Sequence, residues 1–453
     1  MPPAGFSEQC TVAVVGAGPA GMAAATLAAE LGLDAALIDA RPRPAGRTRA
    51  AIAVSPDPGL LFTDSDARRA LRVDALARAG ARFIGDAAVV SVARNEVGFE
   101  IALAVDGKPA TIRARKLIVA AAEQDRPFPI PGWSLPGVMT AGEAQAGFMS
   151  AGRIPSGRTM LAGCGPFIYL VAWQLLQAGV ELVGIVDTLQ RSRLFRALPY
   201  AWGFARSPYY KEQAAILQEI NERVALFRGA TAIAALGNER LASVRFVANG
   251  TATTLLTDEL LLHQGFVPDV ALSGALGCDH RWDGALMCWK PRVDRWGASS
   301  IADIYIAGDA AGMADVVAAE HRGRLAAVAA AATPGSADTR EARAAPDFAG
   351  LARASQGRAF NDTLYLPAKQ FRIASGATIV CRCEGVAAQD IVAAVRDGCD
   401  SSEMIRTALR CGAGRCQGRL CGLPINELIA RERGVRPCDT EMLRARFPMA
   451  PAD

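Results

Sequence analysis

Residues 11–39 read TVAVVGAGPAGMAAATLAAELGLDAALID, and this segment sets the fold class. Apolar runs at 11–15 and 35–38 predict two parallel strands, and the alanine-rich stretch between them predicts a helix. The turn between the first strand and the helix has the spacing G-x-G-x-x-G, formed by Gly16, Gly18 and Gly21. The first glycine permits a tight turn, the second lets the backbone approach a pyrophosphate, and the third allows close packing of helix on strand. The segment therefore predicts a βαβ unit that binds a dinucleotide.

Asp39 ends the second strand, 18 residues after Gly21. A carboxylate at this position suits hydrogen bonding to the hydroxyl groups of an adenosine ribose and disfavours a 2′-phosphate. The helix N-terminus would offer free N–H groups to the phosphates. A glycine-rich turn without any ligand is the alternative interpretation.

A second unit of the same kind begins at residues 159–162, turns at GCGP and returns through VELVGIVD. Ile168 stands where the third glycine would be, and we expect it to hinder close packing of the helix and binding of a pyrophosphate, although Asp187 could hold a ribose. We therefore predict a second domain of the dinucleotide-binding type and leave open whether it binds a nucleotide. The late segment SIADIYIAGDAAG, residues 300–312, predicts the return of the chain to the first domain. The second domain would then be inserted into the first.

The composition excludes some classes of function. The net charge is only +4 over 453 residues and no basic run stands out, so nucleic-acid binding is not supported. The longest apolar stretch, residues 160–186, contains glycines and polar residues that disfavour a membrane span. No targeting segment is visible, so we expect a cytoplasmic protein, with peripheral association with the inner face of the membrane as an option.

Cysteines are concentrated near the C-terminus, where six of the eleven fall between residues 381 and 421. Two close pairs suit the four thiolates of a [2Fe–2S] cluster, namely Cys381, Cys383, Cys416 and Cys421. We expect the members of each close pair to share one iron. A structural zinc site with the same ligands and a set of buried structural thiols are the alternatives. Cys411 could take the place of Cys416.

These motifs together resemble a known family, the α-type subunits of opine oxidases and hydrogen cyanide synthases, which includes the D-hydroxyproline dehydrogenases. The resemblance covers nearly the whole chain. It is carried by VVGAGPAGMAAA (14–25), RPFPIPGWSLPGVMTAGEAQ (126–145), LGCDHRWDGAL (276–286), IAGDAAG (306–312), CRCEGV (381–386) and GAGRCQGRLCG (412–422). It favours Cys416 over Cys411, because the ligand motif of the family is C-Q-G-x-x-C.

The resemblance implies FAD as the dinucleotide. The run from Ser300 to Asp309 resembles the second FAD motif of glutathione-reductase-like flavoproteins, in which the aspartate binds the ribityl chain. Gly308 would let the strand end close to the ligand. In the loop after Asp39, Arg47 stands where the family has glutamine, and it is a further candidate for contact with FAD. The place of the usual Ala-Thr-Gly is held by residues 120–122 followed by glutamate.

The resemblance also implies a function that depends on partners. Family members of this type transfer electrons, while a flavoprotein subunit similar to D-amino-acid oxidases oxidises a CH–NH or CH–NH2 donor. A small ferredoxin-like [2Fe–2S] subunit often joins, and a quinone or another acceptor, rather than NAD, takes the electrons. None of the three histidines stands in a recognisable acid–base constellation, so we predict no catalytic residue in this chain. The competing functions are a self-contained NADH-dependent reductase and a non-catalytic nucleotide-binding assembly subunit.

The expected fold is therefore α/β, with two Rossmann-like domains in the glutathione-reductase arrangement and a small, mainly helical cluster domain. The expected boundaries are 1–130 and 266–332 for the FAD domain, 131–265 for the second domain, 333–376 for a connector, 377–435 for the [2Fe–2S] domain and 436–453 for a tail.

Overall fold

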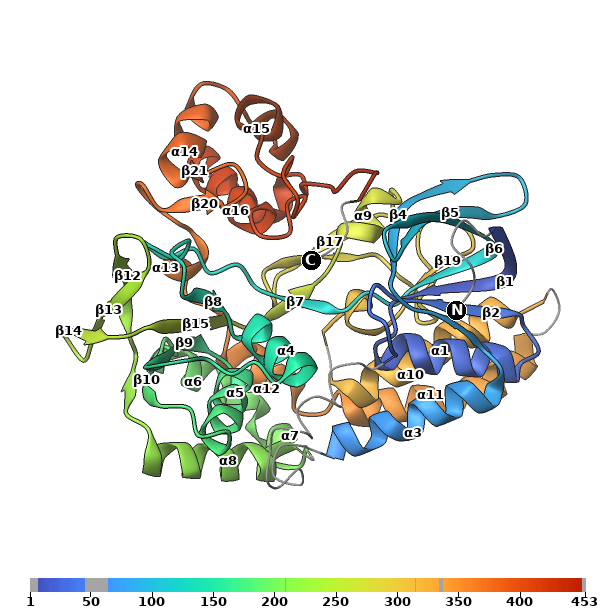
Figure 1. Cartoon of the computed structure of the whole chain (residues 1–453), viewed down its shortest axis with the longest axis horizontal. Helices are drawn as coiled ribbons and strands as arrows, with labels where there is room; N and C mark the ends of the chain where they lie inside the picture. Colours follow the sequence, from blue (N-terminus) through green and yellow to red (C-terminus); the bar gives the residue numbers. More distant parts are fainter. Residues whose placement is uncertain (1–6, 45–63, 208, 314, 334–336, 450–453) are drawn as a thin grey trace.

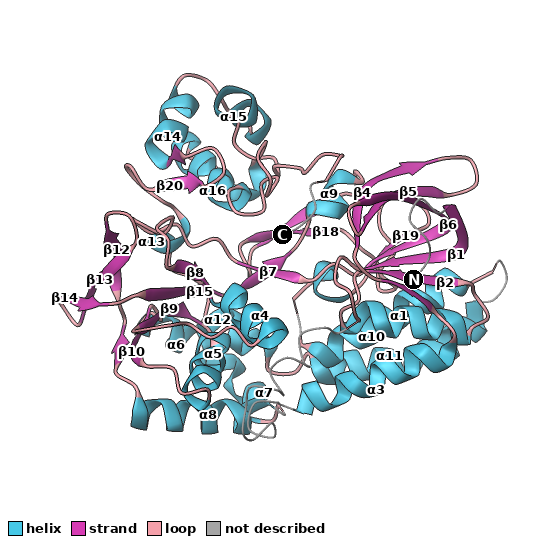
Figure 2. Ribbon diagram, viewed as in Figure 1, coloured by secondary structure: helices cyan, strands magenta, loops and turns pink. Residues whose placement is uncertain are grey.

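The structure is a computed structural model that describes residues 7–44, 64–207, 209–313, 315–333 and 337–449. Figure 1 shows two α/β bodies side by side, with a third, mainly helical body above them. Figure 2 shows that strands form the centre of each α/β body and that helices cover them. The predicted fold class, with two Rossmann-like domains and a small C-terminal domain, is confirmed.

The first sheet has the strand order β3-β2-β1-β6-β5-β4, with β19 paired to β6. Strands β1, β2, β3, β6 and β19 run parallel, while β4, β5 and β6 form an antiparallel meander. Strand β19 pairs with β6 although it follows it much later in the sequence, so the chain returns to its first sheet. The bounds are β1 Ser7–Val15, β2 Ala35–Ile38, β3 Arg82–Ile84, β4 Ala87–Arg94, β5 Phe99–Val105, β6 Lys108–Val119 and β19 Ile304–Ile306.

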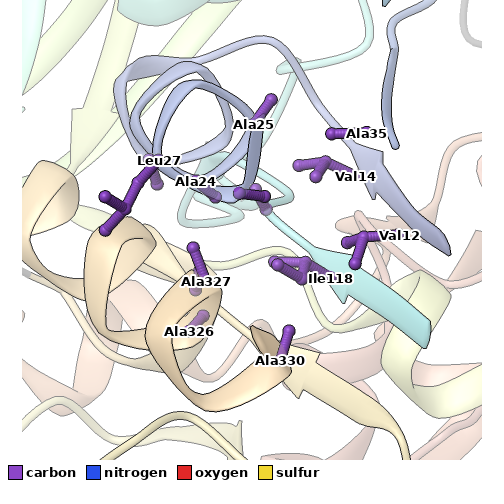
Figure 3. Packing of buried hydrophobic residues seen from close by; sticks show 14 of the residues in the cluster. Val12, Val14, Ala24, Ala25, Leu27, Ala35, Ile118, Ala326, Ala327 and Ala330 are labelled. Atoms are coloured by element: carbon purple, nitrogen blue, oxygen red, sulfur yellow. The ribbon is translucent and has the colours of Figure 1, made fainter. Parts of the chain in front are cut away.

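Helices rich in small residues pack beside this sheet: α1 Pro19–Glu30, α3 Asp64–Ala79, α10 Val316–Ala331 and α11 Ala337–Ala354. Figure 3 shows alanines of α1 and α10 beside Val12, Val14 and Ile118 of the sheet. The two helices approach closely, because a methyl group at Gly323 would lie 2.1 Å from the carbonyl oxygen of Ala20. None of the helices in the described residues is long and apolar enough to cross a bilayer.

The second sheet is parallel throughout, with the strand order β11-β10-β9-β15-β8. An antiparallel sheet of three strands, β12 to β14, packs against it through Phe246 and Leu262. The bounds are β8 Val138–Thr140, α4 Ala141–Ala151, β9 Thr159–Cys164, α5 Pro166–Gln177, β10 Leu182–Asp187, α6 Arg191–Ala197, η2 Leu198–Tyr200, α7 Ala201–Ala205, α8 Tyr209–Arg223, β11 Leu226–Arg228, β12 Thr231–Gly237, β13 Leu241–Ala248, β14 Thr251–Leu256 and β15 Glu259–Gln264.

Two chain crossings join these bodies, and they pair with each other. Strand β7 (Glu123–Asp125) leads out of the first body, and β16 (Phe266–Pro268) leads back into it as its antiparallel partner. After β16 come α9 (Ala271–Ala275) and the hairpin of β17 (His280–Asp283) and β18 (Cys288–Pro291).

The segment predicted as a connector is largely helical. Helix α11 packs on the first body through Ala344, Phe348 and Leu351. Helix α12 (Arg358–Leu364) contacts α6 and α7 of the second body, and its Phe360 stacks on Phe204 of α7 with ring centroids 4.7 Å apart. Helix α13 is Lys369–Arg372. Sequence periodicity missed these helices because they are short or expose most of their surface.

The C-terminal body contains a two-stranded ribbon and three helices around its own core. The bounds are β20 Ile379–Cys381, β21 Val386–Ala387, α14 Ala388–Arg396, α15 Ser402–Leu409, α16 Gly422–Arg433 and η4 Pro437–Asp439. The tail is part of the packed structure, since Leu443 enters this core and Met449 enters the core of the first body.

Candidate cofactor sites

The first glycine turn is built so that two of its glycines cannot carry a side chain. Gly16 has φ +104°, and a methyl group there would lie 2.4 Å from the carbonyl oxygen of Ala120. A methyl group at Gly21 would lie 1.7 Å from the carbonyl oxygen of Gly16. Gly18 differs, because a methyl group there would meet nothing within 4 Å. Open space therefore lies beside the N-terminus of α1, where a pyrophosphate would have to sit.

Asp39 is fixed at the edge of this turn. One carboxylate oxygen accepts a hydrogen bond from the Ala17 backbone N–H at 2.6 Å, and the other accepts one from the Arg41 N–H at 2.9 Å. The side chain is half-exposed, so its remaining lone pairs are accessible to ribose hydroxyl groups. Arg47 lies outside the described residues.

The second motif forms a short 3-10 turn, η3 (Gly308–Ala311), directly before α10. Gly308 has φ +66°, and a methyl group there would lie 2.7 Å from the Ala20 side chain, so this turn meets the start of α1. The largely buried Arg322 donates to the carbonyl oxygen of Gly312, and its charge interacts with that of Asp309. Burial lowers the pKa of Arg322. The two sequence motifs thus come together in space.

A cavity of about 950 Å³ extends from Asp309 into the space between the two α/β bodies. Glu123 of β7 lines it from the first body, and His263 lines it from the second. The connector contributes Asn361 and Tyr365. All three parts of the chain therefore meet at one cavity, which is large enough for a flavin ring.

A histidine–aspartate pair at this cavity was not predicted from the sequence. The buried ring of His263 makes a 2.7 Å contact from Nδ1 to Asp125, and the rings of Phe167 and Phe266 flank it with centroids 4.9 and 4.8 Å away. The second oxygen of Asp125 accepts from the Gly142 N–H at 3.0 Å. His263 lies in β15 and Asp125 in β7, 138 residues apart, so no local pattern joins them.

The second glycine turn forms despite Ile168. A methyl group at Gly163 would lie 1.5 Å from the carbonyl oxygen of His263, so this glycine is required. The expectation that Ile168 hinders close helix packing is wrong, since the side chain is fully buried in the core between α5 and the sheet.

Asp187, the candidate ribose contact of this turn, is enclosed. The side chain is only 3% exposed, and burial raises its pKa. One oxygen accepts from the Tyr169 hydroxyl at 2.8 Å, and the other accepts from the Leu189 N–H at 2.8 Å. The connector lies close by, since the Cys164 thiol contacts the carbonyl oxygen of Tyr365 at 3.3 Å. A ribose would therefore have to displace both a tyrosine and a connector segment.

The predicted ligand cysteines lie together in the C-terminal body. Cys381 and Cys421 are buried, Cys416 is partly buried and Cys383 is exposed. Hydrogen-bonding contacts join the sulfur of Cys381 to that of Cys421, and the sulfur of Cys416 to those of Cys421 and Cys383. In the described part of the chain, no three His, Cys, Asp or Glu side chains are arranged to hold a single metal ion.

Backbone N–H groups also point at these sulfurs. Cys381 accepts from the N–H groups of Gly412 and Glu384, and Cys416 accepts from those of Gly418 and Leu420. Donors of this kind are typical of iron–sulfur sites. Thiol contacts, first with Cys411 and then with Cys421, lower the pKa of Cys381 to about 2.

The contacts from Cys381 to Cys421 and from Cys383 to Cys416 cross between the two close pairs. Cys411, the alternative to Cys416, also lies beside Cys381. The segment that follows it approaches the ligands too, because the Gly412 N–H donates to Cys381 and a methyl group at Gly414 would lie 2.4 Å from the Cys383 side chain.

The cysteine loop docks on the first body beside the cavity. The side-chain amide of Gln124 donates to the carbonyl oxygen of Arg419 at 3.0 Å, and Arg419 pairs with Asp269 at 3.2 Å. Farther along the interface, the Trp289 indole donates to Asn426 at 2.7 Å. Gln124 belongs to β7 and directly follows Glu123, which lines the cavity.

Known proteins share both parts of this arrangement. The family model for pyridine nucleotide-disulphide oxidoreductases matches residues 10–333, and the BFD-like [2Fe–2S] binding domain matches residues 379–431. The A subunit of opine oxidase from Agrobacterium tumefaciens is 37% identical, over 98% of this chain and 91% of that protein. The chain belongs to the family of opine oxidase A subunits. Its cofactors are therefore FAD and a [2Fe–2S] cluster, and it is an oxidoreductase.

More distant members and structures agree with this assignment. Hydrogen cyanide synthase subunit HcnB of Pseudomonas aeruginosa is 29% identical over 97% of this chain and 96% of that protein. The structure of L-proline dehydrogenase from P. horikoshii superposes with a TM-score of 0.73 at 17% identity, covering 99% of this chain and 79% of that one. At that identity the likeness concerns the fold alone.

Proposed function

We propose that this chain is the electron-transfer subunit of a heteromeric dehydrogenase or oxidase. The observation that carries the proposal is the position of β7. This strand lines the cavity at Glu123, and its next residue, Gln124, hydrogen-bonds to the cysteine loop. A flavin in the cavity and a cluster at the loop would lie on opposite sides of one strand.

We propose that FAD is held by the two motifs that meet at the start of α1. Gly16 and Gly21 form the turn, and Gly18 leaves room for the pyrophosphate. Asp39 accepts from the ribose and Asp309 from the ribityl chain, with Gly308 placing Asp309. We keep Arg47 as a candidate contact. Bound FAD supplies two-electron chemistry, which the cluster can pass on one electron at a time.

For the cluster, we propose the ligands Cys381, Cys383, Cys416 and Cys421. Cys381 and Cys421 would hold the cluster from the buried side, and Cys383 and Cys416 would hold it from the side nearer the surface.

A reductase that takes hydride from NADH is the weaker candidate. Its nucleotide would need Asp187, whose two oxygens are both engaged and which is nearly inaccessible. NADH should therefore fail to bleach the flavin of the isolated chain in a stopped-flow experiment. Rapid bleaching would instead make the chain a self-contained reductase.

The names of the relatives support a partner. The opine oxidase relative and HcnB are each named as one subunit of an enzyme. We propose that a D-amino-acid-oxidase-like flavoprotein binds and oxidises an opine, hydroxyproline or another amino acid at its CH–NH or CH–NH2 group. A small ferredoxin-like protein can join, and a quinone or another acceptor takes the electrons, at the inner face of the membrane. In this proposal the substrate-binding residues belong to the partner.

Co-expression with the oxidase-like partner tests the function. The isolated chain should not oxidise amines, and the complex should reduce a dye when given the substrate. Gln124→Ala together with Arg419→Ala should slow cluster reduction in that complex while flavin reduction stays unchanged. Gln218→Ala, on the exposed surface of α8, is the matched control. Full turnover by the isolated chain would refute the proposal.

A further inference from the structure

Large apolar side chains lie exposed on one short segment of the second body. Residues 191–206 form α6, η2 and α7, and in these three elements only Ala197 is buried. Phe195 is 73% exposed and Trp202 is 68% exposed. The other large apolar side chains exposed on this segment are Leu194, Leu198 and Tyr200. We call residues 191–206 the apolar–basic segment.

Packing within the chain uses only one side of the apolar–basic segment. Phe204 stacks on Phe360 of α12, and Ala197 is fully buried. Helices of seven and five residues are marginal in water and are stabilised by packing of their apolar side chains. Here most of those side chains face away from the protein. A contiguous exposed patch of this kind is typical of a surface that binds a partner or a membrane.

The segment carries charge of one sign. It contains four arginines and no Asp or Glu, and because the net charge of the whole chain is also +4, the remainder is neutral overall. Among the described residues, no carboxylate pairs with any of the four. Arg206 lies over the ring of Trp202, 4.2 Å from its centroid. The arginines are Arg191, Arg193, Arg196 and Arg206.

These charges and the place of the segment distinguish between its possible occupants. A second copy of the chain, bound about a two-fold axis, would bring the same arginines together, and like charges across an interface are costly. A chain that takes electrons from the cluster has to reach the C-terminal body, whereas Figure 1 places α7 and α8 at the end of the second body remote from it. An anionic lipid surface complements both the charge and the exposed aromatic rings.

We propose that the apolar–basic segment binds the surface of an anionic phospholipid bilayer. Phe195 and Trp202 enter the headgroup region, and the arginines pair with lipid phosphates. The inference rests on the proposed function in one respect, the placement of the enzyme at the inner face of the membrane. It adds the surface that makes the contact, and it leaves the cysteine loop free for other chains.

Flotation of the full, FAD-loaded chain with vesicles tests the surface. One set of vesicles contains phosphatidylglycerol and phosphatidylethanolamine, and the other contains only phosphatidylcholine, which has no net charge. Phe195→Ser with Trp202→Ser removes apolar contact, and Arg191→Gln with Arg196→Gln removes charge. FAD retention shows that each variant is folded.

The controls make the same kinds of change on the first body. Leu71→Ser with Val97→Ser alters two apolar side chains that are 66% and 77% exposed. Lys108→Gln with Arg115→Gln removes two exposed positive charges. Both controls should bind vesicles as the unaltered protein does.

The unaltered chain should float with the anionic vesicles and not with phosphatidylcholine alone. The double arginine variant should bind roughly ten- to thirtyfold more weakly, because each basic residue contributes independently at an anionic surface. The Phe195 and Trp202 variant should bind about tenfold more weakly or worse. High salt should weaken binding of the unaltered chain more than that of the arginine variant.

Three results would overturn the inference while the electron-transfer role stands, since flotation needs neither a partner nor turnover. The first is an unaltered chain that stays at the bottom of the gradient with anionic vesicles. The second is equal flotation of all variants, which would place the contact elsewhere. The third is a chain that ignores vesicles but loses self-association, or its complex with the oxidase-like partner, in the Phe195 and Trp202 variant. A chain that floats but holds no FAD or cluster would instead overturn the proposed function.

Discussion

Replacement of Gly323 by alanine tests whether the crossing of α1 and α10 sets the FAD site. Gly323 lies in α10, where its backbone touches that of Ala20 in α1. Both helices begin at a proposed FAD contact, because α1 follows the glycine turn and α10 follows the Asp309 turn. A change in the spacing of the two helices should therefore alter both stability and FAD retention.

The magnitude follows from two opposing effects. Alanine favours a helix interior over glycine by about 1 kcal/mol. The new methyl group, however, would lie 2.1 Å from the oxygen and 2.8 Å from the carbon of the Ala20 carbonyl. Ordinary contacts need about 3.5–4.0 Å, and backbone atoms cannot rotate away. The helices must separate, and because both atoms belong to the backbone the cost falls at the upper end of the range for overpacked cores, about 2–3 kcal/mol. We expect a net loss of about 1–2 kcal/mol.

The assay compares thermal unfolding with the fraction of FAD that remains after gel filtration. At about 2–4 °C per kcal/mol, Gly323→Ala should lower the midpoint by about 2–8 °C and release FAD more readily. Gly147→Ala is the matched control, because this glycine of α4 has room for a methyl group, with its nearest neighbour 3.6 Å away. That variant should be slightly more stable than the unaltered protein. If the two variants behave alike, the reasoning from helix spacing fails.

Three further predictions follow from the sites. Asp39→Ala should lower FAD retention without unfolding the protein, measured as flavin released on heating; retention of only NAD or ATP would refute the FAD assignment. Burial raises the pKa of Asp187, and Tyr169→Phe should raise it further by removing a donor to the carboxylate. When a carboxyl group has a raised pKa in the folded state, the folded protein loses stability as the pH rises through that pKa. Tyr169→Phe should therefore lower the free energy of unfolding by about 1–3 kcal/mol, and by more at about pH 8 than at about pH 4. Cys416→Ser should abolish the visible bands and the EPR signal of the cluster, whereas Cys399→Ser should keep both.

The sequence predicted the fold because the relevant signals are local. The strands at 11–15 and 35–38 and the turn between them follow from apolar runs and glycine spacing, and the structure has β1 and β2 there. The return at residue 300 was also predictable, because its motif is of the nucleotide-binding type. The domain boundaries stay a prediction.

The site was less predictable because its contacts are distant in sequence. The packing of α12 on α6 brings Tyr365 to the cavity, and no pattern in a stretch rich in Ala, Pro, Ser and Arg indicates it. The sequence pointed to Ile168 as the residue that disfavours a nucleotide, whereas in the structure the neighbouring Tyr169 occupies the carboxylate of Asp187. The approach of Cys411 to Cys381 depends on a left-handed residue, Arg410, which glycine counting does not reveal.

The return of β19 to the first sheet has a consequence for biosynthesis. All strands of the second body lie between residues 138 and 264, so they leave the ribosome before β19 and α10 do. The first body lacks its Asp309 turn and half of its alanine-rich helix pair until residue 331 has been made. FAD therefore meets a complete site only after about three quarters of the chain has emerged, and the inserted body can fold first although it comes second in the sequence.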